Sequence, residues 1–239
     1  MTAITRTASL SEMDASEGWV LFGDVVGSRR ARVEAAAWLR SLVGELDEVY
    51  GREKLAPFGF TQGDEVQGLL CATADPMQAV LHAALREGPR PIRWVCIRGA
   101  VDRGEGPATQ RTGPAFVAAR SAIEAARNGH ERLVIRIGQA EADELLGGMT
   151  PAMAELLQAL TGRQKVVARL ALIDGLRQSE VAERLKVRRA TISVSFARAK
   201  VLPLARLAGA IRRVCSSSLD CATPQATGNV EVEGEGGVS

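Results

Sequence analysis

The sequence predicts an α+β fold in which a ferredoxin-like βαββαβ domain precedes an all-α helix-turn-helix domain. Two observations support this prediction. Continuous apolar runs, typical of buried strands, alternate with stretches of helical periodicity from residue 19 to residue 146. Beyond residue 160, three short helical patterns follow one another in a strongly basic stretch.

The order of the expected elements gives the first domain its fold. A buried strand at 19–26 precedes a helix at 32–50, where apolar residues recur at helical spacing. Right-handed crossovers would leave the first strand in the middle of an antiparallel sheet, beside the third strand. The later expected elements are strands at 55–61 and 66–72, a helix that begins at 76, a strand at 92–101, a helix at 114–127, a strand at 132–137 and a short helix at 140–146.

Composition divides the chain into five segments. Residues 1–18 are polar and are expected to form a flexible N-terminus before the α/β domain at 19–146. Glycine and proline at 147–151 indicate a linker, 147–159, and the helix-turn-helix domain then covers 160–214. Residues 215–239 have too little apolar content to offset their ordering entropy, so a disordered acidic tail is expected.

Charge is distributed unevenly along the chain. Residues 19–159 carry 16 Lys+Arg and 18 Asp+Glu, whereas residues 160–214 carry 13 Lys+Arg and 3 Asp+Glu. The basic segment therefore has a net charge of +10, and the tail that follows has −4. Because such a surplus of cations repels itself without an anionic partner, duplex DNA is the expected partner. A helical bundle with a solvated basic face is the alternative.

The basic segment has the layout of a helix-turn-helix. Helices are expected at 161–173, 178–185 and 189–200, and a short turn joins the last two. The last helix would enter the major groove, where Arg pairs with guanine and small apolar groups contact thymine methyls. A homodimer is expected, since such modules commonly read paired half-sites. The candidate DNA-contacting residues are Arg188, Arg189, Thr191, Val194, Ser195, Arg198 and Lys200.

This segment resembles the helix-turn-helix of sigma-factor region four and of related bacterial regulators. Those families usually have glycine in the turn, and Ser or Thr caps the recognition helix. Lys186 and Arg188 occupy these places here, and a missing cap costs about 1 kcal/mol. The resemblance implies a role in transcription regulation.

Acidic residues stand at what should be one end of the sheet. Asp24 lies late in the first strand, and Asp64 and Glu65 lie at the tip between the second and third strands. In a split-βαβ sheet this tip sits beside the end of the first strand. Asp24, Asp64 and Glu65 are therefore candidate ligands of Mg²⁺, with phosphates completing its shell. Alternatively, Asp24 and Asp64 only accept hydrogen bonds in their own turns.

Four motifs occur in the order that is seen in the SatD family of bacterial proteins, which this chain resembles. They are FGDVVGS at 22–28, QGDE at 62–65, IRGAVDRG at 97–104 and GPAFVAAR at 113–120. That family also carries a C-terminal helix-turn-helix, so the resemblance implies the same two-part organisation.

The same motifs are similar, more distantly, to those of nucleotidyl cyclases. This resemblance implies a cyclase-like first domain in which Asp24 and Asp64 hold metal and a helix arginine meets phosphate. Phe116 stands where cyclases have Asn. The candidate phosphate-binding residues are Ser28, Arg29, Gly63 and Arg120.

The sequence therefore predicts a DNA-binding, regulator-like protein whose cyclase-like domain binds a metal or nucleotide ligand. Two alternatives stay open: a magnesium-dependent nucleotidyl transferase or cyclase-like enzyme, and a protein that binds RNA or polymerase. The residues favour a binding protein over an enzyme. No apolar stretch has the length of a membrane span. The four cysteines are scattered without a metal-binding spacing, so a reducing, cytoplasmic location is expected.

Overall fold

A mixed five-stranded sheet forms the centre of the computed structural model, which describes residues 15–27, 32–61, 65–88 and 90–220. The strand order is β2-β3-β1-β4-β5. Antiparallel pairing joins β1 to β3 and β4 and joins β2 to β3, whereas β5 runs parallel to β4. The strands are β1 (Ala15–Val25), β2 (Lys54–Phe60), β3 (Glu65–Cys71), β4 (Ile92–Asp102) and β5 (Leu133–Arg136).

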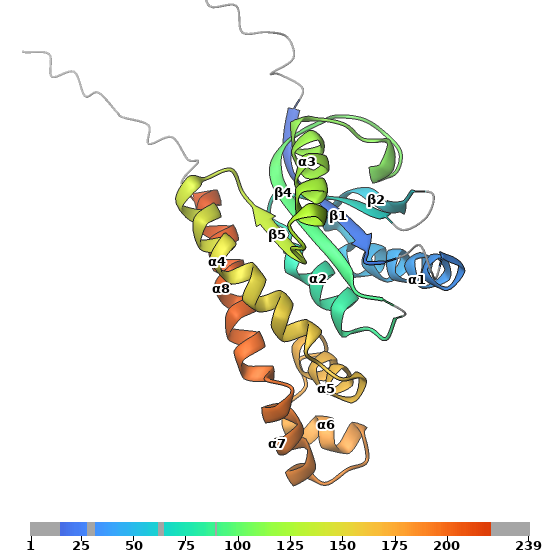
Figure 1. The fold of residues 1–239 in the computed structure, drawn as a ribbon, viewed down its shortest axis with the longest axis vertical. Helices are drawn as coiled ribbons and strands as arrows, with labels where there is room; N and C mark the ends of the chain where they lie inside the picture. The colour runs from blue at the N-terminus through green and yellow to red at the C-terminus, as the bar shows by residue number, and fades with distance from the viewer. Residues whose placement is uncertain (1–14, 28–31, 62–64, 89, 221–239) are drawn as a thin grey trace, which may run out of the picture.

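Helices cover both faces of this sheet, so the fold is α+β (Figure 1). The alternation of side chains along β1 divides the core between the two faces. Val20 and Phe22 pack with α3 (Pro114–Asn128). Trp19 and Leu21 belong to the core on the opposite face, which α1 (Arg32–Tyr50) and α2 (Pro76–Leu85) also enter.

The remaining helices form an extension below the sheet in Figure 1. α4 and α8 are the two long helices of this extension, and they lie side by side. Three short helices occupy its far end, between α4 and α8 in the sequence. The bounds are α4 (Ala140–Gln158), α5 (Gly162–Leu172), α6 (Gln178–Arg184), α7 (Arg189–Arg198) and α8 (Val201–Asp220).

The segment 147–159 was expected to be a linker, but residues 147–158 are the second half of α4 and Ala159 is its C-cap. Glycine and proline disfavour a helix interior by about 1 and 3 kcal/mol. Against this cost, Leu146, Met153 and Leu157 are buried in the core on one face of the helix, and each buried side chain of this size contributes about 1.5–3 kcal/mol. The Thr150 hydroxyl also donates to the carbonyl of Leu146, 2.9 Å away, next to Pro151.

The ends of the folded region also differ from expectation. β1 begins at Ala15, within the segment expected to be a flexible N-terminus. α8 continues to Asp220, so residues 215–220 belong to a helix and not to the acidic tail. The reason is that Cys215 extends the buried stripe Leu204, Ala208 and Ile211 by one more helical turn. Residues 1–14 and 221–239 lie outside the described part of the chain.

The sheet and the helical extension share one apolar core. The cluster that contains Trp19 and Leu21 also contains Ala168 of α5 and Leu204 of α8. Two ion pairs join the same parts: Arg169 Nη2 lies 2.6 Å from Glu45 Oε1, and Arg212 Nε lies 2.6 Å from Asp75 Oδ2. The two parts are therefore packed as one body. In the described residues, no helix has both the length and the apolar character needed to span a membrane.

Candidate nucleic-acid interface and carboxylate cluster

The three short helices α5, α6 and α7, here called the three-helix unit, have a small core of their own. Val167, Val181 and Ile192 are buried together, one from each helix. Thr161 caps α5: its hydroxyl accepts from the backbone N–H of Gln164, and the Gln164 side chain accepts from the backbone N–H of Thr161. Val166 of α5 lies outside this core and is 37% exposed.

The turn between α6 and α7 contains a backbone conformation that favours glycine. Lys186 has φ 52°, in the left-handed region. Its N–H donates to the carbonyl of Glu183, and the N–H of Val187 donates to the carbonyl of Ala182. Arg188 is the N-cap of α7 and its side chain makes no capping hydrogen bond. Lys186 therefore stands where the turn favours Gly, and Arg188 stands at the N-cap, where Ser or Thr is usual.

The outer face of α7 is open to solvent. Arg189, Thr191 and Val194 are exposed, with Val194 at 51%, while Ile192 faces the core. Ser195 is half-buried and its hydroxyl donates to the Thr191 carbonyl, so it can still accept a hydrogen bond but its proton is already used. The predicted contact residues thus lie together on one helix and its two ends.

Few of the cations in the basic segment are neutralised by the protein itself. Of the thirteen between 160 and 214, three pair with carboxylates: Arg169 with Glu45, Arg212 with Asp75, and Arg177 with Glu180. In the part of the chain that the structure describes, the others have no acidic partner. Six of these unpaired cations are exposed on α6, in the turn that follows it, on α7 or at the ends of α7: Arg184, Lys186, Arg188, Arg189, Arg198 and Lys200.

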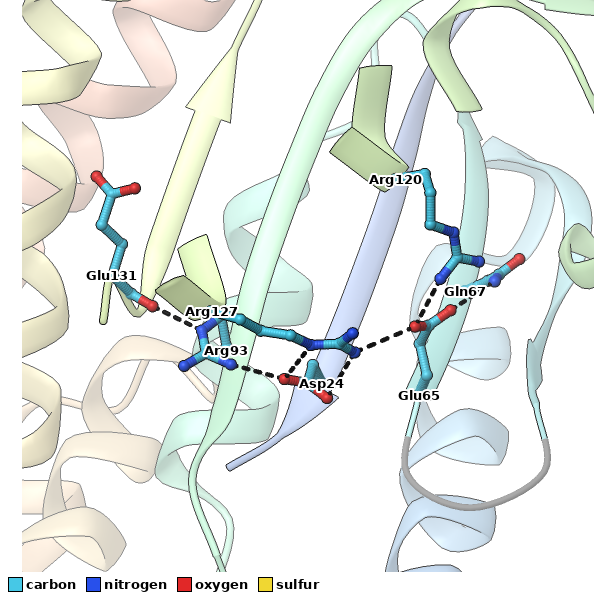
Figure 2. A network of polar contacts seen from close by, with 7 residues as sticks. All are labelled: Asp24, Glu65, Gln67, Arg93, Arg120, Arg127 and Glu131. Atoms are coloured by element: carbon cyan, nitrogen blue, oxygen red, sulfur yellow. Dashed lines mark hydrogen bonds and ion pairs between the residues drawn. The ribbon is translucent and has the colours of Figure 1, made fainter. Parts of the chain in front are cut away.

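A second cluster of charged residues crosses the sheet. Asp24 on β1 is the cross-strand neighbour of Glu65 on β3 and of Arg93 on β4. All three side chains are buried, with 6% of each residue exposed. Arg93 Nη1 donates to Asp24 Oδ2 at 2.6 Å, and Arg93 Nε donates to the carbonyl of Glu131 at 2.8 Å (Figure 2).

Two arginines of α3, seven residues apart and so on one face of the helix, complete this carboxylate cluster (Figure 2). Arg127 binds Asp24 in a bidentate manner, with distances of 2.9 and 3.1 Å, and lies 3.4 Å from Glu65 Oε2. Arg120 Nη1 donates to the same Glu65 oxygen at 2.9 Å. Its guanidinium also lies over the Phe22 ring, 4.7 Å from the centroid.

These residues do not fit a magnesium site as they are arranged. Gln67 donates to Glu65 Oε1, and arginines donate to the other carboxylate oxygens of Asp24 and Glu65. A metal ion would have to displace these donors. The structure therefore brings Asp24, Glu65 and Arg120 together as an ion-pair network. The expected site residues Ser28, Arg29, Gly63 and Asp64 lie outside the described residues.

Arg93 and Arg127 are parts of this cluster that the sequence analysis missed. Arg93 carried a signal, because a charged residue near the start of an apolar strand must find a partner once it is buried. Phe116, at the position of the cyclase Asn, packs edge-on against Phe22 at a centroid distance of 6.2 Å. It is 8% exposed and thus part of the core under α3.

Comparison with known proteins gives one family match. A model of the SatD family matches residues 19–194, and no curated protein matches this chain. A solved bacterial light-regulated adenylyl cyclase is similar at 15% identity and TM-score 0.40, over 51% of this chain and 43% of that chain. A regulator of polyketide synthase expression from Bifidobacterium adolescentis is similar at 12% identity and TM-score 0.31, over 84% of this chain and 82% of that chain. Neither structural likeness is close enough to indicate a function.

Proposed function

The chain belongs to the SatD family, and we propose that it is a DNA-binding, regulator-like protein that docks on duplex DNA through α7. The observation that carries this proposal is the set of exposed cations on α6 and α7 that have no acidic partner in the described structure. Phosphate groups of a duplex would neutralise them and release counterions, which is the main source of affinity for proteins of this kind.

In this proposal the three-helix unit is a helix-turn-helix, with α6 as the first helix and α7 as the recognition helix. A turn of four residues, 185–188, separates them, and three to four residues are usual for such a turn. Arg189, Thr191 and Val194 would face base edges, whereas Arg188, Arg198 and Lys200 would meet phosphates. We further propose that two copies bind together, one to each half-site.

The five-stranded sheet with α1, α2 and α3, here called the sheet unit, serves as the body from which this module projects. The pairing of β2, β3, β1 and β4 supports the proposal that it is a ferredoxin-like, cyclase-related core to which β5 has been added. The carboxylate cluster favours a structural role for Asp24 and Glu65, since every one of their oxygens has a donor. A regulator therefore accounts for more of the observed contacts than an enzyme does.

The test is a binding titration of the full chain with a fluorescently labelled duplex of mixed sequence, between about 50 and 200 mM KCl. A plot of log affinity against log salt should be a steep line. Each phosphate contact that a substitution removes should make this line shallower, by about 0.9 in slope. Lys200→Gln and Arg198→Gln should each do so. Because Lys200 has φ 49°, Gln is preferred to Gly there so that the backbone preference stays the same.

Two controls make the result specific. Arg52→Gln removes an exposed cation of the sheet unit, in the short turn after α1, and should leave the slope unchanged. Selection of binding sites from random duplexes should give a motif with wild type that is relaxed at one position with Arg189→Ala. Stronger binding to structured RNA than to every duplex, or equal slopes in all variants, would contradict the proposal.

A further inference from the structure

A cavity of about 270 Å³ lies where the sheet unit meets the helical extension. Its walls come from α2, from the start of β4 and β5, from α4 and from α5. The apolar part of the wall includes Val80, Ile92, Leu133 and Leu157, and polar atoms contribute nearly as much of the surface. The volume is near the lower end of the range for small-molecule sites, about 300–1,000 Å³. No residue of the carboxylate cluster and no residue of α7 is among the described residues of this lining.

Two buried N–H groups of the wall have no hydrogen-bond partner. Trp94 is 2% exposed, and its indole Nε1 is buried without an acceptor. Arg132 Nη1 is buried without an acceptor as well, and both residues line the cavity. A buried donor that has lost water and gained no acceptor is unfavourable. Both atoms are closed to water, so Trp94 and Arg132 line the cavity with other atoms of their side chains.

The charged groups around the cavity are positive. Arg86 pairs with Glu45, which also pairs with Arg169, but Lys165 and Arg132 have no carboxylate partner in the described structure. No Asp or Glu stands among the described residues that line the cavity. Burial, and then the neighbouring Arg93, lower the pKa of Arg132 by more than Asp24 raises it. An anion would relieve this, whereas a cation would be repelled.

We propose that this cavity binds a small molecule that combines an apolar, ring-sized body with a carboxylate or phosphate group. The body packs against Ile92, Leu133 and Leu157, and the anionic group pairs with the cationic side chains of Arg132 and Lys165. Lys165 belongs to α5, so a bound molecule touches the sheet unit and the first helix of the three-helix unit at once. Binding at this site does not depend on whether the three-helix unit binds DNA.

The proposal is tested by calorimetry of the full chain with three probes of the same ring: 1-naphthoate, 1-naphthyl phosphate and 1-naphthamide. The acids should bind, and the neutral amide should bind at least about tenfold more weakly, as expected for the loss of charge-assisted hydrogen bonds. The two acids distinguish a carboxylate site from a phosphate site. Equal affinity for the amide, or no binding by either acid, would overturn the proposal and leave a cavity that holds water only.

Ala84→Leu is the decisive variant. Ala84 lies on α2 and lines the cavity, so leucine there fills the space while keeping a good helix former. It should abolish acid binding without lowering the thermal midpoint. Ala118→Leu, the same exchange on the exposed side of α3, should bind as wild type does. Lys165→Gln should weaken the acids but not the amide. If Ala84→Leu bound the acids as tightly as wild type does, the acids would bind elsewhere on the protein and the proposal would be wrong.

Discussion

At the scale of single residues, the strongest constraint is the buried pair of Asp24 and Arg93. Their side chains are 8% and 7% exposed, and Asp24 is the only carboxylate that pairs with Arg93 in the described structure. Breaking a buried pair by removing one charge leaves the other uncompensated, which costs about 3–5 kcal/mol. Asp24→Asn should therefore reduce the free energy of unfolding in urea by about 3 kcal/mol.

Glu131→Gln is the matched control for this prediction. It removes a carboxylate beside the same arginine, but only the backbone carbonyl of Glu131 contacts Arg93, and its side chain is exposed. Its effect should stay within about 0.5 kcal/mol. If the two variants were equally stable, Asp24 would not be the partner that holds Arg93, and a ligand role for this carboxylate would regain support.

The sequence predicted part of this cluster and not the rest, for a physical reason. The order of strands is enough to place Asp24 beside the β2–β3 hairpin, and Glu65 is indeed its neighbour. Whether such carboxylates hold a metal or an arginine depends on side chains brought from elsewhere in the chain. Arg93 and Arg127 come from β4 and α3, 69 and 103 residues from Asp24, and no local pattern fixes which of many arginines arrives.

At the scale of elements, the turn before α7 places a lysine in a backbone conformation that favours glycine. A left-handed conformation costs an L-residue about 1–2 kcal/mol, and Lys186 adopts it with φ 52°. Lys186→Gly should therefore raise the free energy of unfolding by about 1 kcal/mol and increase the thermal midpoint.

Arg184→Gly separates this effect from the loss of a charge. It also exchanges an exposed cation for glycine, but in the last turn of α6, where the backbone is helical. It should lower stability by about 1 kcal/mol, as glycine does in helices. Equal destabilisation by both exchanges would mean that Lys186 is not in a left-handed conformation.

Glu45 on α1 links three elements through its carboxylate. It accepts from His82 of α2, from Arg86 after α2 and from Arg169 of α5. Burial by itself raises the pKa of Glu45, but the hydrogen bonds of Arg169 and His82 outweigh it and lower the pKa to about 2. The pKa is 4.5 without these contacts. This group therefore stabilises the fold above pH 4.5, and its contribution disappears as pH falls toward 2.

Glu45→Gln should remove that pH dependence. The difference in unfolding free energy between wild type and the variant should be constant at neutral pH and should shrink as pH falls below 4.5. Urea unfolding at a series of pH values measures it. Glu48→Gln, at an exposed position on the same helix, is the control and should change the unfolding free energy by less than about 0.5 kcal/mol. A constant difference for Glu45→Gln would show that its contacts do not depend on charge.

Most elements were predictable from local pattern, and the exceptions share a cause. The helix Arg32–Tyr50 has the predicted bounds, because its apolar positions and its burial agree. α4 was predicted only as far as residue 146, since Gly147, Gly148 and Pro151 interrupt a helical pattern locally. The helix continues because Met153 and Leu157, which follow the interruption, are buried in the core. A local sequence pattern does not show the core surface against which these two residues pack.

At the scale of the whole molecule, the shared core predicts a single unfolding transition in place of two. Met153 of α4 and Leu204 of α8 are fully buried in the same cluster as Trp19 and Leu21 of the sheet. All three tryptophans, Trp19, Trp38 and Trp94, belong to the sheet unit. Their fluorescence therefore reports the sheet, whereas most of the circular dichroism at helical wavelengths comes from helices in both parts.

Urea transitions followed by the two signals should coincide, which is the standard test of two-state behaviour. Met153→Ala leaves a cavity in the shared core and should lower both midpoints together, by about 2–5 kcal/mol in unfolding free energy. Leu202→Ala, at a position that is 57% exposed on α8, should change neither. Loss of circular dichroism before fluorescence would mean that the helical extension unfolds on its own. In that case the cavity between the two parts would open before the sheet does, and a molecule bound there would delay only the first transition.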